Sequence, residues 1–288
     1  MKTSTVYLNG DFLAAESARV SVFDRGFIFG DGVYEVIPVF GRRLFRLAQH
    51  LARLDASLAA VRIANPLTPA QWRDVLERLV ADVAEDDQAA YLQVTRGVAP
   101  RDHGFPAGVA PTVFVYVQPL CYPSPEQLGR GVSAITVPDV RWDRCDIKAI
   151  ALLPNILMRQ QAIDAGAAEA ILIRDGEITE GAACNIFAVS KGHAVTPPKG
   201  PHILPGITRD LVLELMRAHK LPCEERAVSE TELRNADEIW LTSSGKEIMP
   251  ITSLDGKPVG TGNPGPLGAQ VLTLYRDYKR AFCDGKAE

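Results

Sequence analysis

The chain has 288 residues, a formal net charge of −4 and a hydrophobic fraction of 47%. These values are typical of one large or two ordinary folded domains with a sizeable core. The slightly acidic balance gives no reason to expect binding to nucleic acid or to an anionic membrane, and no run approaches the roughly 18 apolar residues of a membrane helix.

The cysteines indicate the compartment. There are five, scattered and without a C-x-x-C spacing. This pattern favours reduced thiols in a cytoplasm, and it predicts no zinc or other metal site. The first residues also lack the apolar core of a signal peptide, so we expect a cytoplasmic protein.

Residues 1–119 are expected to form a small α/β domain. Strand-like runs occur at residues 5–8, 32–39, 90–96 and 112–117, and helical periodicity occurs at about 47–62 and 69–84. In the first of these helices, His50 and Arg53 are spaced i, i+3, so they share one face of the helix. This face differs from the one that carries the leucine stripe. A guanidinium group there could bind a phosphate with two hydrogen bonds.

A Gly- and Pro-rich loop follows the third expected strand and contains Arg101 and His103. Binding residues concentrate on loops held by a rigid scaffold, and an Arg-His pair suits a carboxylate substrate. After this domain, residues 120–128 contain two prolines and are expected to be a linker. Residues 129–288 are expected to form a larger domain of short strands and hairpins, with helices near 154–165, 208–219 and 264–281.

Lys148 is the first lysine after Lys2, although arginines are frequent between them. Where only a positive charge is needed, this part of the chain therefore uses arginine. Lysine differs from arginine because it can lose its proton near other cations, here Arg141 and Arg144. A neutral lysine amine is the group that attacks an aldehyde cofactor.

Glu180 lies between two predicted hairpins, whose turns are expected at Asp175-Gly176 and Lys191-Gly192. The carboxylate is expected at a strand end before Gly181, where it could face a pyridinium nitrogen. Two anion-binding signals follow in the chain. Gly206, Ile207 and Thr208 are expected at a helix N-terminus, and a strand is expected to end at Ser243 and Ser244.

Taken together, these motifs resemble the fold-type IV pyridoxal-phosphate enzymes, most closely the D-amino acid aminotransferases. The similar segments span nearly the whole chain: YLNG at 7–10, DRGFIFGDGVYEV at 24–36, HLARL at 50–54, QVTRG at 93–97, RDHGFP at 101–106, RW at 141–142, DIK at 146–148, EG at 180–181, NIF at 185–187, LPGITR at 204–209, TSS at 242–244 and EI at 247–248. The fold implied is α+β, with a small N-terminal α/β domain and a larger pseudo-barrel domain that binds pyridoxal 5'-phosphate.

The resemblance implies a role for each matching position. Lys148 holds the cofactor aldehyde as a Schiff base and moves the α-proton, and Glu180 faces the pyridine nitrogen. The remaining cofactor contacts are Arg53, Leu204, Gly206, Ile207, Thr208, Ser243 and Ser244; the substrate α-carboxylate contacts are Tyr34, Arg101 and His103; and Arg141 lies beside the lysine. The chain departs from the family at Ala182, Ala183 and Cys184, where D-amino acid aminotransferases often have serines, so these positions are not assigned as ligands.

The expected activity is transamination between D-amino acids and 2-oxo acids by a homodimer. Three other functions remain open on the sequence alone. A branched-chain L-amino acid aminotransferase shares the lysine and glutamate, but the loop with Arg101 and His103 argues against it. A 4-amino-4-deoxychorismate lyase would release pyruvate without an amino acceptor. A non-catalytic cofactor-binding protein would show no turnover, although intact Lys148 and Glu180 argue against it.

Overall fold

The structure is a computed structural model that describes residues 5–287. Its contacts divide the chain into two compact units. Unit 1 contains Met1–Cys121, Ile147–Ala151 and Phe282–Glu288, and unit 2 contains Tyr122–Asp146 and Leu152–Ala281. The domain limits expected from sequence, 1–119 and 129–288, did not place the short segment around Lys148 in the first unit.

Unit 1 is built on a six-stranded antiparallel sheet with the order β2-β1-β6-β5-β3-β4. Its strands are β1 (Thr5–Leu8), β2 (Asp11–Ala14), β3 (Gly32–Phe40), β4 (Arg43–Leu44), β5 (Gln88–Thr95) and β6 (Thr112–Pro119). The strands expected from sequence correspond to β1, β3, β5 and β6. The two short hairpin partners, β2 and β4, were not expected, because strands of four and two residues have too few positions to show alternation.

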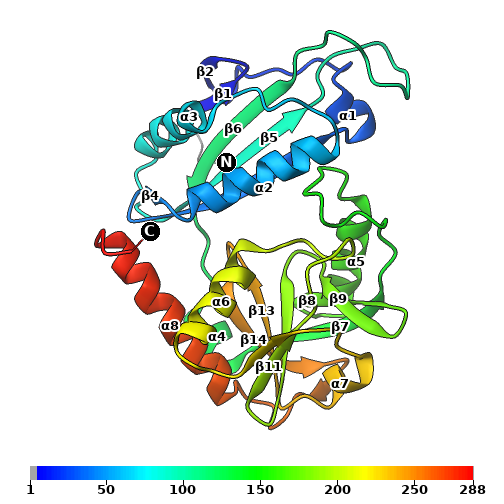
Figure 1. Ribbon diagram of the computed structural model, residues 1–288, viewed down its shortest axis with the longest axis vertical. Helices are drawn as coiled ribbons and strands as arrows, with labels where there is room; N and C mark the ends of the chain where they lie inside the picture. The colour runs from blue at the N-terminus through cyan, green and yellow to red at the C-terminus, as the bar shows by residue number, and fades with distance from the viewer. Residues whose placement is uncertain (1–4, 288) are drawn as a thin grey trace. The chain divides into compact units, whose positions relative to one another are not determined.

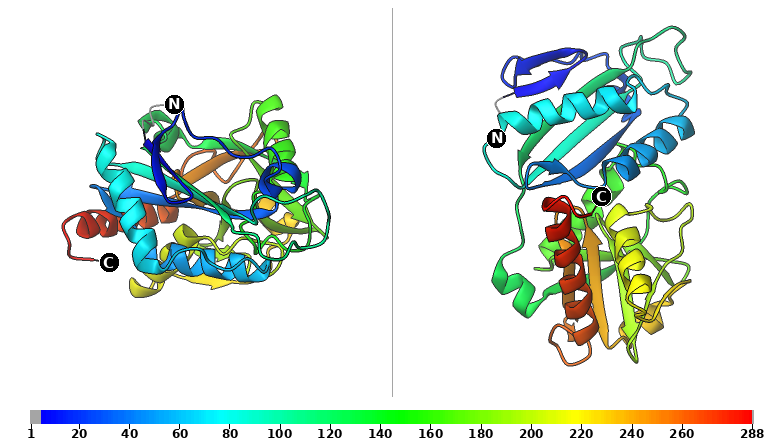
Figure 2. Two further views of the ribbon diagram at one scale, coloured as in Figure 1. Left: turned by 90° about the horizontal axis from the view of Figure 1, so that it is seen from above. Right: turned by 60° about the vertical axis from the view of Figure 1, so that its left-hand side comes forward.

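Helices α2 (Leu47–Ala60) and α3 (Pro69–Asp82) lie on the same face of this sheet, while the short α1 (Arg25–Phe29) precedes β3 (Figures 1 and 2). The leucine stripe of α2 packs with Trp72 and Leu76 of α3 in the core. Thr68 starts α3 with a capping box to Gln71, which satisfies two backbone donors at that end.

Unit 2 is built on a nine-stranded mixed sheet with the order β12-β11-β10-β13-β14-β7-β8-β9, to which β15 adds beside β14. The strands are β7 (Val132–Pro138), β8 (Glu169–Arg174), β9 (Glu177–Gly181), β10 (Asn185–Ser190), β11 (His193–Thr196), β12 (Cys223–Glu225), β13 (Glu238–Ser243), β14 (Glu247–Leu254) and β15 (Lys257–Pro258). β9, at one end of the order, also contacts β10. The sheet therefore curls, as expected for a barrel-like unit.

Both predicted hairpins are present in this sheet. Asp175 and Gly176 have φ values of 53° and 79°, and Lys191 and Gly192 have φ values of 52° and 74°. Two consecutive positive φ values are the signature of a type I′ turn, whose twist matches that of the flanking strands. The first turn sets the register of β8 against β9, and thus the position of Glu180.

The helices of unit 2 lie around this sheet: α4 (Pro125–Arg130), α5 (Leu153–Asp164), α6 (Ile207–Ala218), α7 (Glu230–Arg234) and α8 (Pro266–Cys283) (Figure 1). The segment expected as the linker, residues 120–128, contains the boundary between the two units after Cys121, and it also contains helix α4. Ser124 and Gln127 form a capping box, and Pro125 occupies the first helical turn, where proline is tolerated. Of the described residues, no helix has the length and apolar character needed to cross a membrane.

Candidate functional site

Lys148 is held in unit 1 by hydrogen bonds on both sides of its backbone. Its carbonyl accepts a bond of 2.9 Å from the N–H of Tyr34, and its own N–H donates to Ser57 Oγ at 3.2 Å. The neighbouring Ile150 N–H donates to the carbonyl of Gly32 at 3.1 Å. The segment Ile147–Ala151 thus continues the sheet along β3, which fixes where the lysine side chain starts.

The amine of Lys148 lies over an aromatic ring. Its Nζ atom is 4.1 Å from the ring centroid of Tyr34. Tyr34 stacks on Tyr91, and Tyr91 stacks on Tyr116, with centroid distances of 5.6 and 5.1 Å. This row of three tyrosines crosses β3, β5 and β6 on one face of the sheet and supports the ring beneath the lysine.

Arg53 and His50 do not lie on a solvated helix face. Both are buried against the carboxylate of Glu35 on β3, which is fully buried. Arg53 donates from Nε and Nη2 to the two carboxylate oxygens at 2.7 and 2.8 Å, and His50 Nδ1 lies 2.8 Å from Oε2. The buried carboxylate of Glu35 thus orients the guanidinium group of Arg53, the arginine that is predicted to bind phosphate.

Charge and burial oppose each other in this cluster. Burial by itself raises the pKa of Glu35, but the charge and hydrogen bonds of Arg53 outweigh it, so the pKa of Glu35 falls to about 2. Burial lowers the pKa of His50 below its usual value, in spite of the Glu35 carboxylate. Near neutral pH the cluster therefore holds an ionised Glu35 and a neutral His50.

Arg101 and His103 lie together on an exposed loop of unit 1. The guanidinium carbon of Arg101 is 5.3 Å from the ring centroid of Phe29, and the ring of His103 is 5.5 Å from the same centroid. The loop is anchored by Phe105, whose ring contacts the guanidinium group of Arg96 at 3.7 Å. Within residues 5–287, no hydrogen bond or ring contact joins Tyr34 to this pair.

In unit 2, Glu180 is buried at the end of β9 and is paired with Arg141. The other side of the Arg141 guanidinium group binds Asp139, through Nε at 2.9 Å and Nη2 at 2.8 Å. Thr179 donates a further hydrogen bond of 2.8 Å to Asp139. Burial raises the pKa of Asp139, but the hydrogen bonds and charge of Arg141 outweigh it and lower that pKa to about 2.

Arg144, which was expected to influence Lys148, has a different contact. It forms an exposed ion pair with Asp146 through two bonds of 3.0 Å. The stretch between the end of β7, at Pro138, and Lys148 forms no regular strand.

Asn185 connects Glu180 to the turn before α6. Its amide nitrogen donates to Glu180 Oε2 at 3.2 Å and to the carbonyl of Leu204 at 3.0 Å. The backbone N–H of Leu204 donates to the same carboxylate oxygen at 3.1 Å. A Cβ atom on Gly206 would lie only 1.9 Å from Asn185 Oδ1, so this close approach requires glycine.

The predicted helix N-terminus is confirmed, because α6 begins at Ile207 with Gly206 as its N-cap. No side chain caps this end, so the first N–H groups of the helix can bind an anion. Across the sheet, Asn185 pairs with Thr242, which precedes Ser243 and Ser244. The buried hydroxyl of Thr242 has no hydrogen-bond partner among the described residues.

These groups fit pyridoxal phosphate in their chemistry. Unit 2 offers uncapped helix N–H groups, an unpartnered buried hydroxyl and two further serines, which suit a phosphate. It also offers a buried carboxylate, Glu180, with three donors to keep it ionised, which suits a protonated pyridine nitrogen. Unit 1 offers the amine of Lys148 and the guanidinium group of Arg53.

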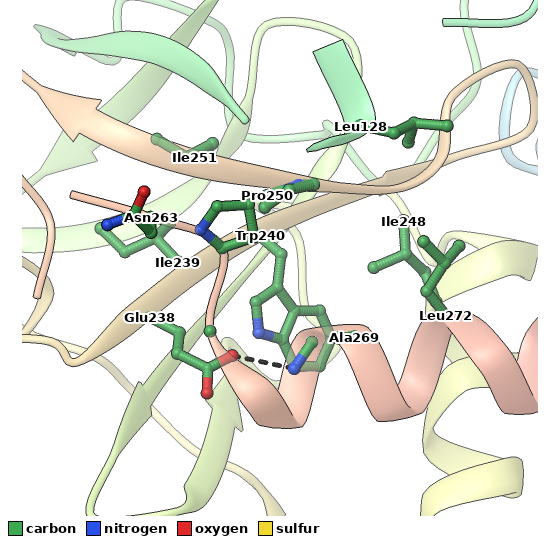
Figure 3. A pocket seen from close by; sticks show the side chains of 13 residues that line it. Leu128, Glu238, Ile239, Trp240, Ile248, Pro250, Ile251, Asn263, Ala269 and Leu272 are labelled. Carbon is green, nitrogen blue, oxygen red and sulfur yellow. Dashed lines mark hydrogen bonds between the residues drawn. The ribbon is translucent and has the colours of Figure 1, made fainter. Parts of the chain in front are cut away.

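The described part of unit 2 also contains a cavity of about 60 Å³ beside α8 (Figure 3). It is lined by Trp240, Pro250, Leu272 and other largely apolar residues, and none of the predicted site residues lines it. Small-molecule sites usually have volumes of roughly 300–1,000 Å³. This cavity is therefore too small for the cofactor.

Sequence reasoning missed three residues of these clusters: Glu35, Asp139 and Asn185. One signal was available for Glu35, because Val33, Glu35 and Ile37 alternate along one strand and must share a face. A carboxylate between two core positions requires a buried cationic partner. Asp139 and Asn185 gave no comparable signal, since their partners are defined by folding.

Residues 32–254 match the family described as amino-transferase class IV. A D-alanine aminotransferase of Bacillus licheniformis is 46% identical over 272 residues, which cover 94% of this chain and 96% of that protein. A D-alanine aminotransferase of Staphylococcus haemolyticus is 36% identical over 274 residues, which cover 95% and 97%.

Among solved structures, the branched-chain amino acid aminotransferase of Escherichia coli superposes with a TM-score of 0.90 at 26% identity. The match covers 100% of this chain and 97% of that one. The expected fold class, α+β of fold type IV, is confirmed by this likeness and by the curled sheet of unit 2. The chain belongs to the class IV amino-transferase family.

Proposed function

We propose that the protein transfers amino groups between D-amino acids and 2-oxo acids with pyridoxal 5'-phosphate. The observation that supports this most is the placement of Lys148. Its backbone N–H and carbonyl are both hydrogen-bonded, and its amine lies over the ring of Tyr34. Similarity to D-alanine aminotransferases over nearly the full chain supports the choice of D-amino acids.

In this proposal, Lys148 attaches the cofactor and, once released by the substrate, takes a proton from the substrate α-carbon with its Nζ atom. When bound, pyridoxal phosphate supplies an electron-withdrawing ring that stabilises the charge left at that carbon. Glu180 keeps the ring nitrogen protonated, because Arg141, Asn185 and the Leu204 N–H favour its ionised form. A well-placed base such as Lys148 is worth about 10²–10⁴-fold in rate.

The phosphate is assigned to Arg53 and to three groups of unit 2. The backbone of Gly206, Ile207 and Thr208 offers uncapped N–H groups, and Ser243 and Ser244 offer hydroxyls. Leu204 is assigned to the cofactor ring. Glu35 and His50 orient Arg53, so that its fork is set before a ligand binds.

The substrate α-carboxylate is assigned to Tyr34, Arg101 and His103. Arg101 and His103 both contact the ring of Phe29, and Arg101 is a cation on a loop, as expected for a carboxylate contact. If these residues hold the carboxylate, the D-enantiomer presents its α-hydrogen to Lys148 and the L-enantiomer does not.

Borohydride labelling tests the assignment of Lys148. The purified protein should be yellow, borohydride should bleach the colour, and peptide mapping should place the cofactor on Lys148. Attachment to Lys199 or Lys246, or no attachment, would refute the assignment.

A branched-chain L-amino acid aminotransferase is the second candidate, because the fold is so similar to the enzyme of Escherichia coli. Single-turnover spectra with paired D- and L-alanine, and with L-leucine, separate the two. Faster reaction with the L-enantiomers would favour the second candidate. Pyruvate release without an amino acceptor would instead indicate the lyase.

We also propose a homodimer in the cytoplasm. The five cysteines form no disulfide within the described residues, which agrees with a reducing compartment. Sedimentation equilibrium should give twice the chain mass of 31.3 kDa, that is about 63 kDa. A monomer that is fully active would contradict the dimer.

A further inference from the structure

Glu169 is a buried carboxylate to which no role has been given so far. It is the first residue of β8, and its side chain has no exposed surface. The Nζ atom of Lys246 lies 3.1 Å from Glu169 Oε2, and the N–H of Ala170 donates to Oε1 at 3.1 Å. An ionised carboxylate at such a position requires a cationic partner, and Lys246 supplies it.

The same carboxylate also contacts the turn that follows Glu180. The buried thiol of Cys184 lies beside Glu169, since a Cβ atom on Gly181 would meet both Cys184 Sγ, at 2.3 Å, and Glu169 Cγ, at 3.4 Å. Cys184 closes this turn, since its carbonyl accepts the N–H of Gly181 at 2.7 Å. A Cβ atom on Gly181 would lie 2.3 Å from Cys184 Sγ, so glycine is required here by close packing and not by a positive φ.

Lys246 in turn closes the turn that contains Ser243 and Ser244. Its backbone N–H donates to Ser243 Oγ at 3.1 Å, while its side chain reaches Glu169. Glu169 therefore connects two turns that are more than fifty residues apart in the chain. One turn follows the proposed ring contact, Glu180, and the other presents the proposed phosphate contacts.

We propose that Glu169 and Lys246 are positioning residues, which hold the Ser243–Ser244 turn at a set distance from the Glu180 turn and so adapt the site to a phosphorylated pyridine. This inference rests on the proposed cofactor site. It also gives Cys184 a place in this arrangement, because its buried thiol packs between Gly181 and Glu169.

The test is the affinity of the cofactor-free protein for pyridoxal phosphate and for pyridoxal, which lacks the phosphate. Lys246→Met should weaken pyridoxal phosphate binding by about tenfold or more, because a charge-assisted contact is lost. The affinity for pyridoxal should change less than about threefold, because Glu180 and Lys148, its proposed contacts, are unchanged in this variant. Lys246→Arg should restore most of the affinity for pyridoxal phosphate.

Lys257→Met is the matched control, because Lys257 is an exposed lysine of the same unit, on β15. It should leave both affinities unchanged. If Lys246→Met weakens the binding of both ligands equally, the loss is one of general folding, and the positioning role is overturned. Unchanged binding of pyridoxal phosphate by Lys246→Met would overturn it as well.

Borohydride labelling of the wild-type protein keeps this inference separate from the proposed function. Attachment to Lys148, combined with wild-type affinity in Lys246→Met, would overturn only the positioning role. Absence of attachment to Lys148 in the wild type would overturn the cofactor site, and this inference with it.

Discussion

Replacing Glu35 by glutamine tests the buried cluster that orients Arg53. Glutamine has nearly the same shape, but it lacks the charge and places an NH₂ group against donors from Arg53 and His50. A pKa of about 2 for Glu35, against an ordinary 4.5, corresponds to about 3 kcal/mol in favour of the ionised folded form. Breaking a buried ion pair by removing one partner costs a similar amount, about 3–5 kcal/mol. We therefore expect Glu35→Gln to lower the free energy of unfolding by about 3 kcal/mol.

The pH dependence gives a second signature with a defined sign. The folded-state pKa of Glu35 is lowered, so its contribution is fully present above the ordinary pKa of 4.5 and is lost as the pH falls toward about 2. The contribution of Glu35 to the difference between wild type and Glu35→Gln should thus be fully present above about pH 4.5 and should shrink as the pH falls below it.

The assay is urea unfolding of the cofactor-free proteins, because a bound cofactor would add its own stabilisation. Glu77→Gln is the matched control: Glu77 pairs with Arg73 at 3.4 Å, and both side chains are more than half exposed. It should cost less than about 1 kcal/mol. Equal losses in the two variants, or a Glu35→Gln difference that does not change with pH, would refute the reasoning.

Three further predictions concern the site. Glu180→Gln should keep the cofactor bound but slow turnover, because about 2–4 kcal/mol of transition-state stabilisation is lost. Unchanged steady-state turnover would contradict the role of Glu180. Arg101→Ala should raise KM for D-alanine by about 10–100-fold but affect an (R)-aryl amine far less, because that amine has no carboxylate; equal effects on both substrates would contradict the carboxylate contact. Gly206→Ala should lower the unfolding free energy by about 1–3 kcal/mol and weaken cofactor binding, whereas Gly200→Ala, where a Cβ atom meets no neighbour within 4 Å, should do neither in the same titrations.

Local features of this protein could be predicted from the sequence, because neighbouring residues determine them. The turns at Asp175-Gly176 and Lys191-Gly192 follow from residues that accept positive φ between apolar runs. The start of α6 at Ile207 follows from a glycine before a helical apolar period. The order of motifs along the chain was also sufficient to indicate the family.

The segment 120–128, expected as a linker, shows what such reasoning leaves open, because it did not indicate helix α4. Three prolines from Pro119 to Pro125 suggested a linker but did not indicate its structure, and Pro125 lies in the first turn of α4, where it costs no hydrogen bond. Proline at that position is compatible with a helix start and with an irregular segment. The capping box of Ser124 and Gln127 favours the helix.

Only the tertiary structure decided which charges meet in the core. Glu35 pairs with Arg53 from another element, and Glu169 pairs with Lys246, which lies far along the chain. Sequence spacing carries no information about such pairs, because sheet register and helix packing create them. The sequence by itself determined the turns, the helix start and the family. The fold determined the electrostatic partners, since a buried charge is stable only where packing brings its counter-charge within hydrogen-bond distance.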